Sequence, residues 1–249
     1  MIVFVTGASA GFGAAIARRF AKEGHRVVAT GRRRERLEAL VGELGRDKIL
    51  PLVFDVRDRH AVERAFQDLP AAFAEIDVLV NNAGLALGLE PAQKANLDDW
   101  EAMVDTNVKG LMYVTRAALP GMVARDRGLI VNLGSTAARY PYPGGNVYGA
   151  TKALVHQFSL NLRADLLGTR VRVTDIQPGL VGGSEFSAVR FHGDAERAAK
   201  LYEGADALTP EDIAEAIYWV ATLPPRVNIN AIEMMPVTQA FGPLAVHRG

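Results

Sequence analysis

The chain of 249 residues contains no cysteine, which excludes disulfide bonds and thiol catalysis and is typical of cytoplasmic proteins. Its 28 Lys and Arg residues equal its 28 Asp and Glu residues, so no net charge favours nucleic acid or an anionic membrane as a partner. No apolar stretch approaches the roughly 18 residues that a membrane-spanning helix needs. We therefore expect a cytoplasmic, globular protein.

Three kinds of site find no support in the sequence. A serine hydrolase is not indicated, because no Gly-x-Ser-x-Gly motif occurs. A Walker A loop is excluded, because no Gly-Lys-Ser/Thr follows the first glycine-rich turn. A metal site is not expected, because none of the five histidines shows metal-ligand spacing: His25, His60, His156, His192 and His247.

Strand-like apolar runs alternate with helix-like segments along almost the whole chain. The predicted strands cover residues 2–5, 26–30, 49–54, 76–80, 128–133, 170–176 and 229–234. The helices between them include 35–44, 60–69, 147–166, 211–222 and a long stretch over 97–124 that Pro120 is expected to kink or break. This alternation predicts one α/β domain with a doubly wound parallel sheet and helices on both faces.

The first predicted strand runs directly into Thr6-Gly7-Ala8-Ser9-Ala10-Gly11-Phe12-Gly13 and then into a helix. Glycines at such a turn let the backbone come close to a diphosphate, which the N–H groups of the helix N-terminus then bind. The spacing of Gly7, Gly11 and Gly13 favours a dinucleotide site. A strand–helix turn that merely needs small residues is the alternative.

The second predicted strand ends in Thr30-Gly31-Arg32-Arg33-Arg34, where an NAD site usually has an acidic residue for the ribose 2′-hydroxyl. A guanidinium can instead bind the 2′-phosphate of NADP with two hydrogen bonds. We therefore expect Arg32 and Arg33 to select NADP, with Arg34 at the solvated start of the next helix. A basic helix face without a ligand is the alternative.

A candidate catalytic group follows the fifth predicted strand. Ser135 comes just after this strand, and Tyr148 and Lys152 are four residues apart on one face of the next helix. A phenol has a pKa near 10, and a cation beside it favours the phenolate and lowers that pKa toward neutrality. Ser135 can hold the reacting oxygen near the tyrosine hydroxyl. Without the dinucleotide turn, such a Tyr/Lys pair would more simply be surface packing.

Together these residues resemble the short-chain dehydrogenase/reductase family over essentially the whole chain. The resemblance implies a single-domain Rossmann-type fold over residues 1–249. The family's landmarks stand here as Thr6-Gly7-x-x-x-Gly11-x-Gly13, Asp55-Val56, Asn81-Asn82-Ala83-Gly84, Asn107, Ser135, Tyr148-x-x-x-Lys152 and Pro178-Gly179.

The resemblance implies further roles for residues that their spacing does not explain. Asp55 would bind the adenine amino group, and Asn107 would hold a water that connects Lys152 to solvent in a proton relay. The remaining implied cofactor contacts are Ser9, Phe12, Val56, Asn82, Ala83, Gly84, Tyr148, Lys152, Pro178, Gly179, Leu180 and Val181.

Within the family, the stretches 81–88, 143–152, 177–186 and 228–239 resemble members that use NADP to act on short 3-hydroxy acids. The resemblance implies oxidation of the 3-hydroxyl of serine, L-allo-threonine or 3-hydroxyisobutyrate, or reduction of 3-oxo acids such as malonic semialdehyde. It also implies a substrate lid around residues 182–206, a distinct C-terminal segment over 236–249, and a cytoplasmic homotetramer.

Two points stay open in the sequence. Arg190 is a candidate to bind the substrate carboxylate, but a plain surface arginine is an equally good interpretation. The alternatives for the function are a reductase of the same family that acts on another carbonyl, such as a 3-oxoacyl thioester or a ketone, and a non-catalytic NADP-binding protein.

Overall fold

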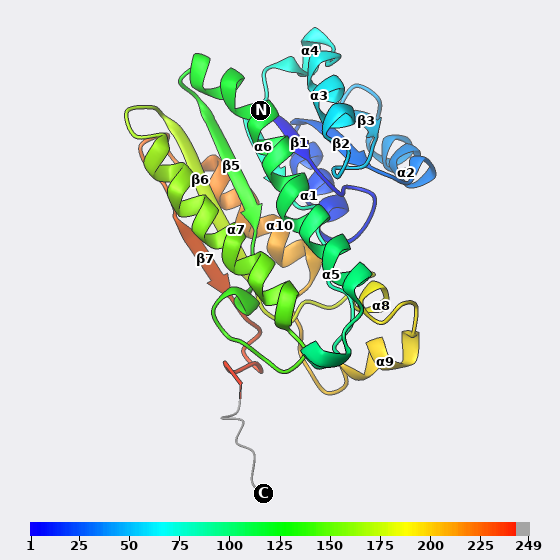
Figure 1. Cartoon of the computed structure of the whole chain (residues 1–249). Helices are drawn as coiled ribbons and strands as arrows, with labels where there is room; N and C mark the ends of the chain where they lie inside the picture. The colour runs from blue at the N-terminus through cyan, green and yellow to red at the C-terminus, as the bar shows by residue number, and fades with distance from the viewer. Residues whose placement is uncertain (243–249) are drawn as a thin grey trace, which may run out of the picture.

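A computed structural model describes residues 1–242 (Figure 1). One sheet holds seven parallel strands in the order β3-β2-β1-β4-β5-β6-β7, which confirms the predicted fold class. The strands are β1 (Ile2–Val5), β2 (Arg26–Gly31), β3 (Ile49–Val53), β4 (Val78–Asn81), β5 (Gly128–Leu133), β6 (Val171–Pro178) and β7 (Ala231–Met234). Of the predicted C-terminal segment over 236–249, residues 243–249 lie outside the described residues.

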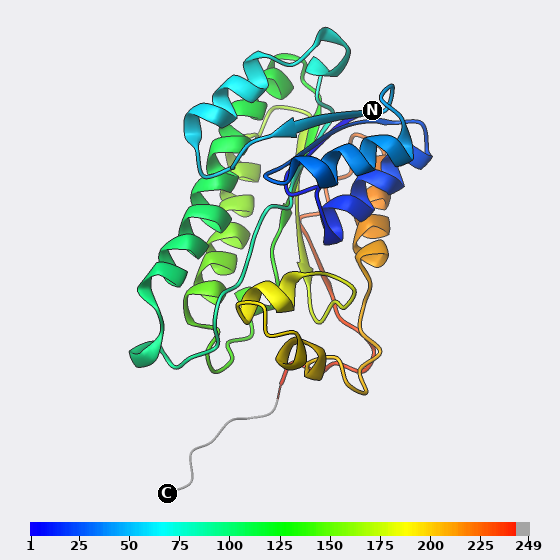
Figure 2. The same cartoon turned by 90° about the vertical axis from the view of Figure 1, so that its right-hand side faces the viewer.

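Helices cover both faces of the sheet, as Figure 2 shows with the sheet seen nearly edge-on. On one face lie α1 (Gly11–Lys22), α2 (Arg34–Leu44) and α10 (Pro210–Thr222). On the other face lie α3 (Arg59–Gln67), α5 (Leu97–Val104), α6 (Leu111–Ala124) and α7 (Asn146–Asp165). No helix of the described part is long and apolar enough to cross a membrane.

The two hydrophobic cores explain why the strands are apolar at successive positions. Successive side chains of a strand point to opposite faces of the sheet. Val3 and Val5 therefore pack with α1, α2 and α10, whereas Ile2 and Phe4 pack with α3, α6 and α7. Both faces of the sheet are thus buried, and ligands can bind where the strands end.

The predicted break in the long helical stretch lies elsewhere than expected. Pro120 stands inside α6, and the change in helix geometry comes earlier, in the π-helical segment η2 (Asp105–Gly110) between α5 and α6. Asn107 is anchored there by hydrogen bonds to Leu85 and Thr151. π-Helical turns are rare and often mark functional sites. The prediction of a break at Pro120 is therefore wrong, and a kink there stays a prediction.

Short elements went unpredicted because three to six residues show too little periodicity. They are α4 (Ala71–Ala74), η1 (Ala92–Lys94), η3 (Thr136–Ala138), α8 (Phe186–Arg190) and α9 (Ala195–Lys200). The helices α8 and α9 lie beyond the carboxyl ends of the strands (Figure 2). They belong to residues 182–206, whose role as a substrate lid stays a prediction.

Candidate active site

The carboxyl edge of the sheet collects the predicted site residues. Because the strands are parallel, the turns that follow β1 to β6 all lie at this edge, where ligands of open α/β sheets bind. The turns carry residues 7–13, Arg32 and Arg33, Asp55 and Val56, residues 82–84, Ser135, and residues 178–181. Asn107 comes from η2, Tyr148 and Lys152 from α7, and Arg190 from α8.

The glycine-rich turn packs too tightly for any side chain at Gly13. A Cβ atom there would lie 2.3 Å from the carbonyl oxygen of Gly7 and 2.6 Å from Nδ2 of Asn82. Gly7 and Gly11 have φ angles of +68° and +51°, a region that residues with side chains rarely adopt. The turn therefore brings the N-terminus of α1 close to β1, as a site for a diphosphate requires.

Thr6 connects this turn to the turn after β4. Its hydroxyl oxygen accepts hydrogen bonds from the backbone N–H groups of Asn82 and Ala83, both at 2.9 Å. Asn82 in turn donates from Nδ2 to the Thr6 carbonyl at 2.8 Å. Sequence reasoning assigned no role to Thr6, although a polar residue at the end of a buried strand is a signal. The contacts fix one wall of the cleft.

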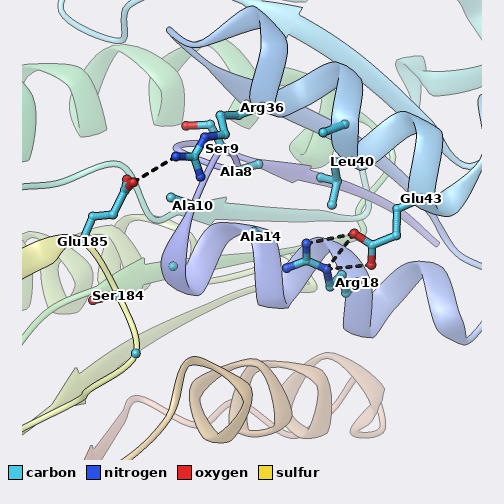
Figure 3. Close-up of a pocket in the computed structure, with 13 residues that line it drawn as sticks. Ala8, Ser9, Ala10, Ala14, Arg18, Arg36, Leu40, Glu43, Ser184 and Glu185 are labelled. Carbon is cyan, nitrogen blue, oxygen red and sulfur yellow. Dashed lines mark hydrogen bonds and ion pairs between the residues drawn. The ribbon is translucent and has the colours of Figure 1, made fainter.

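A cavity of about 500 Å³ lies beside the glycine-rich turn (Figure 3). Ser9 and Gly11 line it from the turn, Arg36 from α2, and Ser184 and Glu185 from the segment before α8. Arg33, the residue that precedes α2, points Nε and Nη2 toward Oγ of Ser9, at 3.4 and 3.3 Å. This edge of the sheet therefore presents arginine donors next to the predicted diphosphate site.

Arg32 lies differently from Arg33. Its guanidinium is largely exposed and stands 3.9 Å from the Asp55 carboxylate. Asp55 mainly pairs with Arg57, whose Nη2 donates to it at 2.7 Å. Burial would raise the pKa of Asp55, but the hydrogen bonds from Arg57 outweigh burial and lower that pKa below its ordinary value. The implied contact of Asp55 with adenine therefore stays a prediction, on a carboxylate that already has a partner.

The candidate catalytic residues lie close together at the carboxyl end of β5. Tyr148 and Lys152 are both buried, with 8% and 7% of their surfaces exposed. The Lys152 ammonium donates to the Leu133 carbonyl at 2.6 Å and stands 5.9 Å from the centroid of the Tyr148 ring. Ser135 precedes η3, and its Oγ accepts a hydrogen bond from the N–H of Ala137 at 3.1 Å. The structure thus brings Ser135, Tyr148 and Lys152 together.

The pKa values of this group differ from the expectation that Lys152 lowers the pKa of the phenol. Burial raises the pKa of Tyr148 to about 12, although Ser135 and Arg190 both act to lower it. Burial also lowers the pKa of Lys152 to about 8, against the opposite effect of Asp175. Desolvation dominates both groups because it disfavours whichever form carries charge. At neutral pH the phenol is neutral and the ammonium is charged.

Asn107 lies next to the lysine across Gly84. A Cβ atom on Gly84 would lie 3.3 Å from Oδ1 of Asn107 and 3.6 Å from Nζ of Lys152. The Asn107 amide is held on both sides, since it bonds the backbone of Leu85 and donates to Oγ1 of Thr151 at 3.1 Å. The structure therefore places Asn107 beside the catalytic candidates, and its implied water stays a prediction.

Arg190 reaches the same place from α8. Its guanidinium carbon lies 5.5 Å from the centroid of the Tyr148 ring, and its Nη2 donates to the Tyr142 hydroxyl at 2.5 Å. Nε donates to the Gly88 carbonyl at 3.3 Å. The sequence left open a plain surface position for Arg190, but the side chain is partly buried beside Tyr148. Sequence reasoning missed Tyr142, because its contact depends on how α8 folds back.

The end of β6 completes the edge. Gly179 donates its N–H to the Met234 carbonyl, and Leu180 donates to Oε1 of Gln239 at 2.7 Å. Val181 pairs with Leu208 in an isolated β-bridge. These bonds tie residues 178–181 to the C-terminal part of the described chain, at the end of the strand that pairs with β5.

A buried polar cluster behind the site was not predicted. Asp175 on β6 is fully buried, and its Oδ2 contacts Nδ1 of His156 at 2.8 Å and accepts a hydrogen bond from Gln177. A Cβ atom on Gly134, just before Ser135, would lie 2.3 Å from Oδ1 of Asp175. An acidic residue inside a strand of a parallel sheet, which is buried on both faces, is the signal that could have revealed this cluster.

The residues at this edge fit a dinucleotide that carries a 2′-phosphate. The glycine-rich turn leaves no room for side chains, the N-terminus of α1 faces it, and the arginines that follow β2 take the place of an acidic residue. The candidate proton-transfer group lies further along the same edge, at Tyr148.

The chain belongs to the short chain dehydrogenase family, whose family model matches residues 1–193. The NADP-dependent 3-hydroxy acid dehydrogenase YdfG of Salmonella typhimurium is 68% identical over 248 residues, and that of Escherichia coli K12 is 64% identical, each over the full length of both chains. The serine 3-dehydrogenase of Agrobacterium fabrum is 52% identical over 246 residues, covering 99% of this chain and 98% of that protein.

Solved structures agree with the sequence comparisons. The closed form of a serine dehydrogenase complexed with NADP+ superimposes with a TM-score of 0.99 at 64% identity, over 100% of both chains. A serine dehydrogenase from Escherichia coli gives a TM-score of 0.86 at 60% identity and covers 96% of this chain and all of that one. The described fold is therefore closely similar to that of the serine dehydrogenase in its NADP+ complex.

Proposed function

We propose that the chain is an NADP-dependent dehydrogenase that oxidises the 3-hydroxyl of short 3-hydroxy acids, such as serine, L-allo-threonine and 3-hydroxyisobutyrate. In the reverse direction it reduces 3-oxo acids such as malonic semialdehyde. Full-length similarity to 3-hydroxy acid dehydrogenases supports the activity. The observation that carries the substrate class is Arg190, a cation 5.5 Å from the ring of Tyr148 and thus within reach of a substrate carboxylate.

Tyr148 acts as the general acid and base in this proposal. The glycine-rich turn and Arg33 would hold the coenzyme, which would supply hydride transfer to or from the substrate carbon. Tyr148 takes the hydroxyl proton during oxidation and gives it back during reduction. Ser135 holds the reacting oxygen near the phenol. Lys152 and Asn107 flank Gly84 and pass the proton toward solvent, with the water that the family resemblance implies at Asn107.

The activity is tested with the purified chain, NADP and NAD, and four substrates. We expect kcat/KM to be highest for serine, L-allo-threonine and malonic semialdehyde, and much lower for a 3-oxoacyl thioester. Tyr148→Phe should lower kcat about a hundredfold to ten-thousandfold, the usual contribution of a positioned proton-transfer group, while NADPH still binds. Preference for the thioester would favour the alternative reductase, and full activity of the Phe variant would refute the mechanism.

The role of Arg190 has its own test. Arg190→Met should raise KM for serine about tenfold to a hundredfold, since it removes a charged hydrogen-bond donor to the carboxylate. KM for an uncharged short alcohol should stay unchanged. Arg197→Met is the matched control, because Arg197 lies in α9 of the same segment and packs on Phe191 instead. An unchanged ratio of the two KM values in Arg190→Met would contradict the assignment.

Assembly and location belong to the same proposal. We infer a cytoplasmic homotetramer, as the family resemblance implies. Exposed apolar side chains on α6 and α7 support self-association: Met112, Leu154 and Leu160. Light scattering on the purified protein tests the subunit number. Fractionation of the host cells tests whether the protein is cytoplasmic.

A further inference from the structure

Glu185 joins the 182–206 segment to the arginines at the start of α2. Its carboxylate accepts hydrogen bonds from Nη1 of Arg33 at 2.7 Å and from Nη2 of Arg36 at 3.3 Å. Figure 3 shows the Arg36 and Glu185 side chains pointing toward each other across the cavity beside Ser9. The Arg36–Glu185 ion pair therefore lies on the wall of the cavity, and Arg33 reaches the same carboxylate from the residue before α2.

The Arg33 guanidinium contacts two different residues, Glu185 and Ser9. Nη1 binds Glu185, whereas Nε and Nη2 form a two-donor edge toward Ser9. The contacts with Oγ of Ser9, at 3.4 and 3.3 Å, are longer than ordinary N–H···O hydrogen bonds, so this edge is weakly engaged. Such an edge is the geometry that binds a phosphate with two parallel hydrogen bonds.

We propose that Glu185 sets the affinity for the 2′-phosphate of the coenzyme by competing with it for Arg33 and Arg36. This inference deepens the proposed NADP dependence and rests on it. A phosphate monoester carries close to two negative charges at neutral pH. It needs the cations that Glu185 already neutralises, so the two anions oppose each other around the same two guanidinium groups.

The competition also links the phosphate to the 182–206 segment. While no phosphate is bound, the ion pairs hold Glu185 and the residues next to it against α2. Gly183, with a φ angle of +68°, provides the turn through which the chain leaves β6 for α8. A phosphate that takes over the arginine donors replaces these two ion pairs. A coenzyme with a 2′-hydroxyl instead leaves the ion pairs intact. Glu185 therefore lowers the affinity for NADP(H) and does not change the affinity for NAD(H).

The test measures binding of NADPH and NADH to the full chain by titration calorimetry, without substrate. Glu185→Gln keeps the size of the side chain and removes its charge. We expect the Kd for NADPH to fall about threefold to tenfold, since the side chains are about half exposed and such ion pairs are partly screened. The Kd for NADH should stay unchanged. 2′,5′-ADP and 5′-AMP should repeat this contrast, because they differ in the 2′-phosphate.

Glu196→Gln is the matched control, because the Glu196 carboxylate pairs with Lys200 within α9. It should leave the Kd for both coenzymes unchanged. Weaker binding of both coenzymes by Glu185→Gln would overturn the inference, because Glu185 would then hold the segment closed over any coenzyme. Unchanged binding of NADPH would overturn it as well. A wild-type chain that binds NADH more tightly than NADPH would instead overturn the proposed coenzyme together with the inference.

Discussion

Lys152 and Tyr148 illustrate how burial sets the chemistry of single residues. Both side chains are almost fully enclosed, and each therefore favours its neutral form relative to water. The ammonium keeps its proton at neutral pH because its pKa of about 8 is still above 7. A phenol with a pKa of about 12 holds the proton that reduction needs, but it must lose that proton before it can act in oxidation.

The pH dependence of the reaction follows from this pair. Oxidation requires the loss of one proton from the two groups together, and the first proton leaves at the lower pKa, about 8. We expect kcat/KM for oxidation to rise about tenfold per pH unit below pH 8 and to level off above it. In reduction, kcat/KM should be constant below pH 8 and fall above it.

Lys152→Arg gives the control for this profile, because a guanidinium stays protonated throughout the range. In the variant the rise for oxidation should continue above pH 8 without levelling off. Initial rates with serine and NADP+ between pH 6 and 10 provide the measurement. Oxidation that does not change between pH 6 and 8 in the wild-type chain would exclude the pair as the titrating group.

At the scale of elements, the strand–turn–helix unit at the N-terminus was predictable, whereas the short helices and contacts of the 182–206 segment were not. Gly7, Gly11 and Gly13 reveal the turn because its geometry depends on the local chain. The contacts of Glu185 and Tyr142 depend on how α8 folds back over the sheet edge, and no local pattern records that approach. The rise in the pKa of Tyr148 also escaped prediction, since burial is a tertiary property.

Gly13→Ala tests the close packing of the first unit. The added methyl group would lie 2.3 Å from the Gly7 carbonyl oxygen, so the turn must shift. We expect the free energy of unfolding to fall by about 1–3 kcal/mol, as for an overpacked site, and NADPH binding to weaken strongly. Thermal unfolding and coenzyme titration measure the two effects.

Gly42→Ala is the matched control for this substitution. Gly42 lies within α2, and a Cβ atom there would meet nothing within 4 Å. Alanine should raise the free energy of unfolding by about 0.5–1 kcal/mol, because it favours the helix over glycine. If both variants were equally stable and bound NADPH alike, the turn would not need glycine at residue 13.

At the scale of the whole molecule, the number of strands and their parallel direction were predictable from the sequence, whereas their order in the sheet was not. Hydrophobic periodicity identified the strands to within about two residues, the usual uncertainty of element ends. The site positions could be predicted because a parallel sheet brings the turns after its strands to one edge. The depth of the cleft and the cavity beside Ser9 could not, since they depend on side-chain packing between distant elements.

The strand order β3-β2-β1-β4-β5-β6-β7 has a consequence for how the protein matures. The groups that act together are supplied by turns and helices scattered from Gly7 to Arg190, and the turns are positioned by strands that pair with sequence-distant neighbours. Chains dominated by such non-local pairings fold slowly. A nascent or proteolytically shortened chain that lacks β6 also lacks one wall of the cleft. We therefore expect activity to appear only when nearly the whole chain has folded, and not to increase gradually with chain length.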